Sequence, residues 1–271
     1  MRRQWKNLFC WAVGVCCLWV AVGIGAQTPA ASSARAQDVK GLAAPGAGEA
    51  PVREGAGKKP DEQPSDFGGL SRYHEADLAL AAPQASENRV VFMGDSITEG
   101  WHFTGSDGFF AGKPYVNRGI SGQTTPQMLV RFRQDVVALQ PSVVVILAGT
   151  NDIAGNTGPM TLEQTEDNLA SMAELAEANH IRVVLCAILP AFDYPWKRGL
   201  EPAGKILKIN AWMKSYAAQK GLAYVDYHAA MKDSRDGLPE TLSKDGVHPT
   251  AAGYAIMTPL VEAGIAQVLA R

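Results

Sequence analysis

The residues of this chain that could do chemistry are a serine behind an apolar run and a carboxylate–imidazole pair far downstream. Ser96 follows the apolar run at residues 90–93 and a Gly-Asp dipeptide, so it stands where a buried strand is expected to end. Asp245 and His248 are three residues apart, before the last predicted helix. A serine hydroxyl is a weak nucleophile unless a neighbouring base takes its proton, and a third group must orient that base. These residue types predict nucleophilic catalysis by Ser96.

Each of these segments also has a structural interpretation. Gly-Asp-Ser tripeptides often cap helices, and Thr98 replaces the second glycine of the Gly-x-Ser-x-Gly elbow found in α/β-hydrolases. The carboxylate of Asp95 is expected to stabilise the turn. Asp245 and His248 alone would also fit an Asx-type turn beside a helix-capping histidine. We favour catalysis because a nucleophile and a base occur in the same chain.

Two further polar segments follow strand-like runs. One is Asn-Arg-Gly, which ends at Gly119, and the other is Gly-Thr-Asn-Asp, which contains Asn151 and Asp152. Together with the serine and histidine segments, and in this order along the chain, they resemble the SGNH (GDSL-type) hydrolases. The resemblance covers about residues 86–265 and is strongest to the acetylhydrolase branch, which includes platelet-activating-factor acetylhydrolase-like proteins and bacterial carbohydrate acetylesterases.

The resemblance implies a role for each of these residues. His248 would take the proton of Ser96, and Asp245 would fix the tautomer of the imidazole. The backbone N–H groups of Ser96 and Gly119 and the side-chain amide of Asn151 would form the oxyanion hole. Gly119 as a turn residue and Asn151 as a helix cap are the structural alternatives. The mechanism that the resemblance implies needs no metal and no organic cofactor.

The substrate is predicted from loop aromatics and from the branch of the family. Trp101, His102, Tyr194 and Trp196 are expected to face the site, where aromatic rings could stack on sugars; the alternative is packing within the loops. The resemblance implies a small-molecule or glycan ester with a short acyl group, in particular acetyl. A lysophospholipase or thioesterase with the same machinery is the alternative enzyme, and a non-catalytic glycan-binding module is the alternative from another class.

The elements that must position these residues alternate between strand and helix. The apolar runs lack polar alternation, as expected for strands buried on both faces, and lie at residues 90–93, 115–117, 143–148, 182–188 and 223–225. Helices are expected over 71–80, 161–179 and 203–219, with a last one from Thr250 that Pro259 interrupts. The pattern predicts a three-layer α/β/α sandwich around a parallel sheet, and the resemblance adds five strands in flavodoxin-like order.

The N-terminal residues predict export. Basic residues precede a charge-free apolar stretch that ends near residue 26, the pattern of a secretory signal peptide at residues 1–26 or, if it is not cleaved, a membrane anchor. Residues 27–66 are rich in Ala, Pro and Gly and are expected to form a flexible linker before a hydrolase domain at residues 67–271. The expected location is therefore periplasmic or secreted, or membrane-anchored.

Charge and composition exclude other function classes. The chain has 25 basic and 27 acidic residues and a formal net charge of -2, which provides no electrostatic footprint for nucleic acid. No membrane contact is expected beyond the N-terminal segment. Asp95, Asp152, Asp245 and His248 are fewer ligands than a two-metal hydrolase usually offers, so no metal site is predicted. Cys186 stands alone in an apolar run and is expected to be a buried packing residue.

Overall fold

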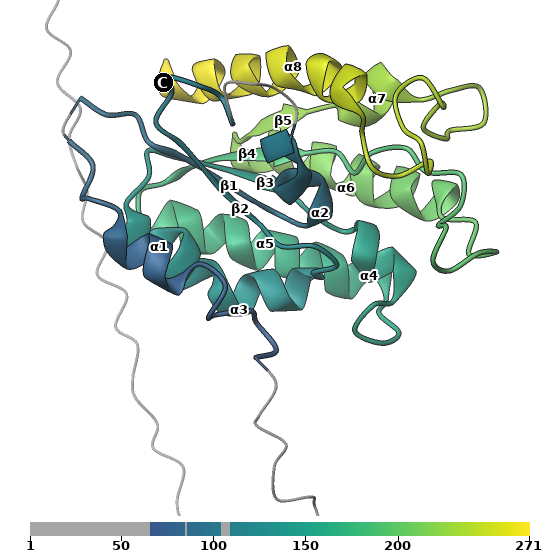
Figure 1. The fold of residues 1–271 in the computed structure, drawn as a ribbon, viewed down its shortest axis with the longest axis horizontal. Coiled ribbons are helices and arrows are strands. Elements are labelled where there is room, and N and C mark those ends of the chain that lie inside the picture. Colours follow the sequence, from purple (N-terminus) through teal and green to yellow (C-terminus); the bar gives the residue numbers. More distant parts are fainter. Residues whose placement is uncertain (1–65, 85, 104–108) are drawn as a thin grey trace, which may run out of the picture. The chain divides into compact units, whose positions relative to one another are not determined.

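A five-stranded parallel sheet forms the centre of the structure (Figure 1). The computed structural model describes residues 66–84, 86–103 and 109–271, without the side chains of residues 102 and 103. The expected signal segment and nearly all of the expected linker lie outside the described residues. The strands run in the order β2-β1-β3-β4-β5, which confirms the flavodoxin-like order. They are β1 (Val90–Gly94), β2 (Tyr115–Gly119), β3 (Val143–Leu147), β4 (Arg182–Cys186) and β5 (Ala223–Val225).

Helices cover both faces of the sheet, which confirms the predicted three layers (Figure 1). One face carries α3 (Thr125–Asp135), α5 (Leu162–Ala178) and α6 (Ala203–Lys220), and the other carries α8 (Ala251–Leu269) with the short α2 (Ser96–Glu99) and α7 (Tyr227–Met231). Alternate residues of β1 enter the two cores: Val91 and Met93 pack toward α3, α5 and α6, while Val90 and Phe92 pack toward α8. Burial on both faces explains why the strands read as continuous apolar runs.

Local sequence signals set the ends of two long helices. At the start of α5, the backbone N–H of Gln164 donates to the Thr161 hydroxyl (3.2 Å) and the Thr161 N–H donates to the Gln164 side chain (2.9 Å), forming the predicted capping box. Helix α6 ends at Gly221, whose φ of 70° lies in the left-handed region that glycine adopts without strain. Both helices therefore begin and end within a residue or so of the predicted bounds.

Two of the longer helices differ from the sequence prediction, and the short helices α4 (Thr150–Ala154) and α7 were not predicted. Helix α3 was not predicted, because its inward face buries the polar residues Arg131 and Asp135 beside apolar ones and so lacks a continuous apolar stripe. Helix α8 is continuous through Pro259, which corrects the expectation of an interruption. Proline removes one helical hydrogen bond, but Met257 and Val261 are buried on either side of it and packing on the sheet holds the helix together.

Helix α8 also meets a membrane-span criterion. Among the described residues it is the one helix that is long and apolar enough to cross a bilayer by length and composition. Core helices of globular domains pass the same test. Tyr254, Ile265 and Val268 of α8 are buried in the core beneath it, so packing against the sheet accounts for its apolar character.

The turn from β1 into α2 depends on close packing at Gly94 and on capping by Asp95. A Cβ atom on Gly94 would lie 2.1 Å from the Thr98 hydroxyl and 2.8 Å from the Leu147 carbonyl oxygen, so only glycine fits. Asp95 is the N-cap of α2 and accepts a hydrogen bond from the N–H of Ile97 (2.9 Å), in agreement with its predicted structural role. Burial raises the pKa of Asp95 to about 7.

Asp95→Asn is expected to change how stability depends on pH. Since burial raises the pKa of Asp95 from 3.8 to about 7, the folded protein keeps a proton in this window that the unfolded chain has released. The free energy of unfolding of the wild type should therefore fall, relative to the variant, as pH rises from about 4 to 7, by up to about 4 kcal/mol. Asparagine retains a side-chain oxygen for the Ile97 N–H but does not titrate. Urea denaturation of both proteins across this range measures the difference, and a difference independent of pH would contradict the prediction.

Candidate active site

The three predicted catalytic residues meet at the carboxyl edge of the sheet. The Oγ of Ser96 lies 2.9 Å from Nε2 of His248, and Nδ1 of His248 lies 2.6 Å from Oδ2 of Asp245. Ser96 is the first residue of α2, directly after β1, whereas Asp245 and His248 lie in the loop between α7 and α8. We call this chain of contacts from Ser96 through His248 to Asp245 the relay. It has the geometry of a nucleophile, its base and the group that orients the base.

Hydrogen bonds keep Asp245 charged and in place. Its Oδ1 accepts from the backbone N–H groups of Val247 (2.9 Å) and His248 (2.8 Å) and from the Ser243 hydroxyl (3.0 Å). Burial alone would raise the pKa of Asp245, but the hydrogen bonds from His248 and Val247 lower it to about 2. An ionised carboxylate only accepts, so the proton of the neutral His248 ring lies on Nδ1 and Nε2 is free to accept from Ser96.

A pocket of about 240 Å³ opens in front of Ser96. Its walls come from the segments that follow the carboxyl ends of β1, β2, β3 and β4 and from the loop before α8, at the edge where sites form in parallel sheets of this kind. The lining residues are Ser96, Ser121, Gly122, Asn151, Asn156, Trp196 and His248.

Two backbone N–H groups at this pocket are free to bind an oxygen. Ser96 occupies the first position of α2, where an N–H has no intrahelical partner. Gly122 has a φ of 77°, and in the part of the chain that the structure describes its N–H has no hydrogen-bond partner. Gly122 was missed by the sequence prediction. The sequence signal that could have identified Gly122 is the Ser-Gly dipeptide, which comes after the single residue that follows β2.

Gly119 has a different role from the one predicted. Its N–H donates to the Asn117 side chain (2.8 Å), and it is not among the residues that line the pocket. A Cβ atom on Gly119 would lie 2.2 Å from the backbone nitrogen of Glu99, so glycine here allows β2 to approach α2 closely. Because its N–H is already bonded, the expectation of an oxyanion donor at Gly119 is corrected.

Asn151 is held rigidly at the wall of the pocket. It lies in α4 (Thr150–Ala154), and its Nδ2 donates to the Gln123 carbonyl (3.0 Å) and, at a longer distance of 3.3 Å, to Asp95. Its Oδ1 accepts from Asn156 (2.8 Å). The next residue, Asp152, accepts from the backbone N–H of Thr125 (3.1 Å), which ties α4 to the start of α3.

The four aromatic residues predicted to contact substrate have different environments. Trp196 is 43% exposed, and its ring centroid is 6.1 Å from that of His248. Tyr194 is fully buried and stacks under Trp196, with centroids 5.1 Å apart, so it supports that ring and does not face the pocket. Trp101 is 4% exposed and packs in the core beneath α8, which corrects the expectation for this residue. The side chain of His102 lies outside the described residues.

Other candidate groups are scarce in the described part of the chain. Between residues 66 and 271, as far as the structure describes them, no three His, Cys, Asp or Glu side chains gather in a way that could hold a metal ion. Cys186 is a free, buried thiol at the end of β4, as the sequence predicted, and burial raises its pKa to about 12. The thiol is therefore a packing group and not a nucleophile.

Comparison with known proteins identifies chains that are similar to this one in sequence and in structure. A solved GDSL-like lipase from Bacteroides thetaiotaomicron is 47% identical, with a TM-score of 0.71, and the match covers 74% of this chain and 98% of that one. An acetylxylan esterase of Xylanibacter ruminicola is 28% identical over 73% of this chain, which spans 49% of the length of that relative. The esterase TesA of Pseudomonas aeruginosa is 31% identical, and the match covers 65% of this chain and 86% of the relative.

The model of the GDSL-like lipase/acylhydrolase family matches residues 92–256, more than half of the chain. This match includes the candidate nucleophile Ser96, the pocket-lining residue Asn151 and the candidate base His248. The chain therefore belongs to the GDSL-like lipase/acylhydrolase family, and it is a serine hydrolase that acts on ester bonds.

Proposed function

We propose that this protein is an exported esterase that removes short acyl groups, in particular acetyl, from carbohydrates through an acyl-enzyme. The observation that carries the proposal is the relay from Ser96 through His248 to Asp245, with successive distances of 2.9 and 2.6 Å. The relay supplies a nucleophile with its base already in contact, which is the first requirement for acyl transfer.

Each step of the proposed reaction uses a group at this pocket. Ser96 Oγ bonds to the ester carbonyl carbon while its proton passes to His248 Nε2. The tetrahedral intermediate collapses, the alcohol leaves with the proton from His248, and the acyl group remains on Ser96. Water then attacks the acyl-enzyme, giving its proton to His248, and the second collapse returns this proton to Ser96 and releases the acid. Asp245 stabilises the imidazolium in both halves.

The negative oxygen of the tetrahedral intermediate would be bound by three donors. We assign the backbone N–H groups of Ser96 and Gly122 and the Nδ2 of Asn151 to this role. Both N–H groups lack a partner in the described part of the chain, and the long 3.3 Å bond from Asn151 to Asp95 is the weaker of its two bonds and the easier to exchange. The two backbone N–H groups are fixed before the reaction and need no reorganisation as charge develops, whereas Asn151 exchanges one hydrogen bond.

The substrate assignment is based on the size of the pocket and on one aromatic ring. A volume of about 240 Å³ suits a small acyl group. Beside it, the exposed ring of Trp196 is held by stacking on Tyr194 and by its Nε1 donating to Asn156 (3.3 Å), so it offers a fixed apolar surface to a sugar ring on the alcohol side. The acetylxylan esterase among the relatives supports an acetylated carbohydrate.

Export is the part of the proposal that rests on sequence alone. Basic residues followed by an uninterrupted apolar stretch at residues 1–26 have the pattern of a signal peptide, and positive charge before the stretch favours translocation of the remainder of the chain. The enzyme would then act in the periplasm or outside the cell, or at the membrane if the segment is retained.

Ser96→Ala is expected to lower kcat for p-nitrophenyl acetate by at least about 10³-fold, because the other pocket hydroxyl, that of Ser121, bonds to Glu99 and not to His248. The far-ultraviolet circular dichroism spectrum should be unchanged. A fluorophosphonate probe should label the wild type and not the variant. Ser171→Ala, which changes a partly exposed serine of α5, serves as the control and should keep full activity. Undiminished turnover by Ser96→Ala would refute the assignment.

Asn151→Ala is expected to lower kcat about 10²-fold with little change in KM, since one donor to the transition-state oxygen is lost. The matched control is Asn210→Ala. Asn210 is also a buried amide and bonds to the backbone of Ile188, but it does not line the pocket, so its loss should lower the midpoint of thermal unfolding without lowering kcat. Equal kcat values for the two variants would show that Asn151 has no role in the reaction.

A series of p-nitrophenyl esters tests the size of the acyl group. Acetate should give the highest kcat/KM, with butyrate lower and octanoate lowest, because the pocket is small and most of the residues that line it are polar, so it offers a long alkyl chain little apolar surface. Rates that rise toward octanoate would instead favour a lysophospholipase or thioesterase with the same catalytic residues.

A further inference from the structure

A segment that precedes the first strand is fastened to the wall of the pocket. The segment runs from Asp66 to Ala79, outside the residues 92–256 that match the family, and includes α1 (His74–Ala79). No apolar residue of helix α1 is buried, and its Leu78 is 71% exposed, so apolar packing does not explain the position of the helix. The polar partners of this segment come from the end of β2, from the loop between β2 and α3, which contains Gly122, and from α3 itself. We call residues 66–79 the strap.

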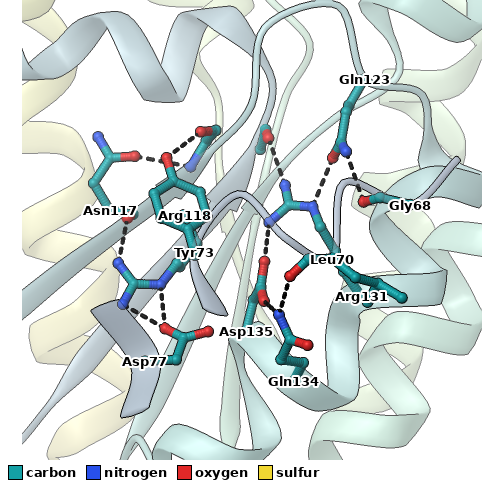
Figure 2. A network of polar contacts seen from close by, with 12 residues as sticks. Gly68, Leu70, Tyr73, Asp77, Asn117, Arg118, Gln123, Arg131, Gln134 and Asp135 are labelled. Atoms are coloured by element: carbon teal, nitrogen blue, oxygen red, sulfur yellow. Dashed lines mark hydrogen bonds and ion pairs between the residues drawn. The ribbon is translucent and has the colours of Figure 1, made fainter. Parts of the chain in front are cut away.

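Three contacts join the strap to the last two residues of β2 and to this loop (Figure 2). The Tyr73 hydroxyl donates to the carbonyl oxygen of Gly119 (2.5 Å), and the Gln123 side chain donates to the carbonyl oxygen of Gly68 (2.9 Å). Asp77 accepts from Arg118 at 2.8 and 2.5 Å, and both of these side chains are nearly excluded from solvent. The contacts lie on both sides of Ser121 and Gly122 in the sequence, so the strap holds the loop at both ends.

A fourth connection passes through the helix that carries the nucleophile. Glu99, the last residue of α2, accepts from Arg72 of the strap through Oε1 (2.9 Å). Its Oε2 accepts from both the backbone N–H (2.9 Å) and the hydroxyl of Ser121. Burial would raise the pKa of Glu99, but the hydrogen bonds from Ser121 and Arg72 hold it below its ordinary value, so the carboxylate is charged. Glu99 thus joins α2, which begins at Ser96, to the opposite wall of the pocket.

The inner side of the loop is held as well. Arg131 of α3 is fully buried, and its guanidinium donates to the Gln123 side chain (2.6 Å), to Asp135 (2.8 Å) and to the carbonyl oxygen of Gly94 (3.1 Å) (Figure 2). The Gln123 carbonyl in turn accepts from Asn151. The loop is therefore fixed from inside by α3, and its outer face at Ser121 is fixed by Glu99.

We propose that Glu99 is a positioning residue for the oxyanion hole and that the strap, through Arg72, holds Glu99 in place. The carboxylate binds the N–H of Ser121, which leaves the next N–H, that of Gly122, directed at the pocket. Without Glu99 the Ser121–Gly122 wall loses two hydrogen bonds to a carboxylate, and the Gly122 donor moves relative to Ser96. This inference rests on the proposed function, because it concerns the same transition state.

Glu99→Ala tests the proposal with p-nitrophenyl acetate and a fluorophosphonate probe. We expect kcat to fall about tenfold and KM to change less than about twofold, since a displaced donor affects the transition state more than substrate binding. Labelling of Ser96 should slow in parallel but reach full stoichiometry, which shows that all molecules are folded. Glu99→Gln keeps an oxygen for Ser121 and should restore kcat to within about threefold of the wild type.

Arg72→Ala tests the strap itself. Arg72 is more than half exposed, so its loss should leave the fold intact while lowering kcat about threefold. In the Glu99→Ala background the same change should have no further effect, because Arg72 acts through Glu99. The matched control is Glu174→Ala, which removes an exposed glutamate paired with Lys220 (3.3 Å) away from the pocket and should leave kcat unchanged.

The results separate this proposal from the proposed function. If the wild type neither hydrolyses the ester nor reacts with the probe, the proposed function fails. If the wild type does both and Glu99→Ala keeps wild-type kcat and labelling rate, the positioning role is wrong while the function stands. Equal losses in Glu99→Ala and Glu99→Gln would also overturn it, because the glutamine retains the acceptor on which the argument depends.

Discussion

The close approach of α2 to the ends of β1 and β2 is the constraint on which the site depends. Two positions without a side chain permit it. A Cβ atom at Gly94 would lie 2.1 Å from Thr98, and one at Gly119 would lie 2.2 Å from the backbone of Glu99. Because the helix is pressed against both strands, its first residue, Ser96, projects at the carboxyl edge of the sheet with a free N–H, beside the loop that carries Gly122. Each glycine thus contributes by leaving space for α2, and neither takes part in the chemistry.

Two carboxylates of this region, those of Asp245 and Asp95, differ in their electrostatic environment. Asp245 receives hydrogen bonds from the His248 ring and from two backbone N–H groups, so its charge is stabilised and can balance an imidazolium. Asp95, the residue directly before the reacting serine, is buried with few donors, and its pKa rises to about 7. A neutral or weakly charged group at Asp95 opposes a negative oxygen in the pocket less than a full carboxylate would.

Much of this arrangement could be predicted from the sequence, and each expectation that was wrong or lacking has a physical cause. The five strands were evident because burial on both faces removes polar alternation, and the relay of Ser96, Asp245 and His248 was evident because few other residue types can perform that chemistry. Helix α3 was missed because its buried face contains the ion pair of Arg131 and Asp135, which hides the apolar period. The glycine donor that we propose at Gly122 was expected at Gly119 instead, because sequence shows where a strand ends but not which N–H is already bonded. Trp101 was taken for a loop residue because an aromatic side chain looks the same in sequence whether it packs inward or outward.

The relay joins residues 152 positions apart in the chain, one on the first strand's turn and the other just before the final helix. A nascent polypeptide that has not yet docked α8 holds the serine without its base. The pair that we assign to catalysis is therefore a property of the completed fold. A chain whose final layer has not packed on the sheet has the hydroxyl without the imidazole beside it, and it should not hydrolyse esters.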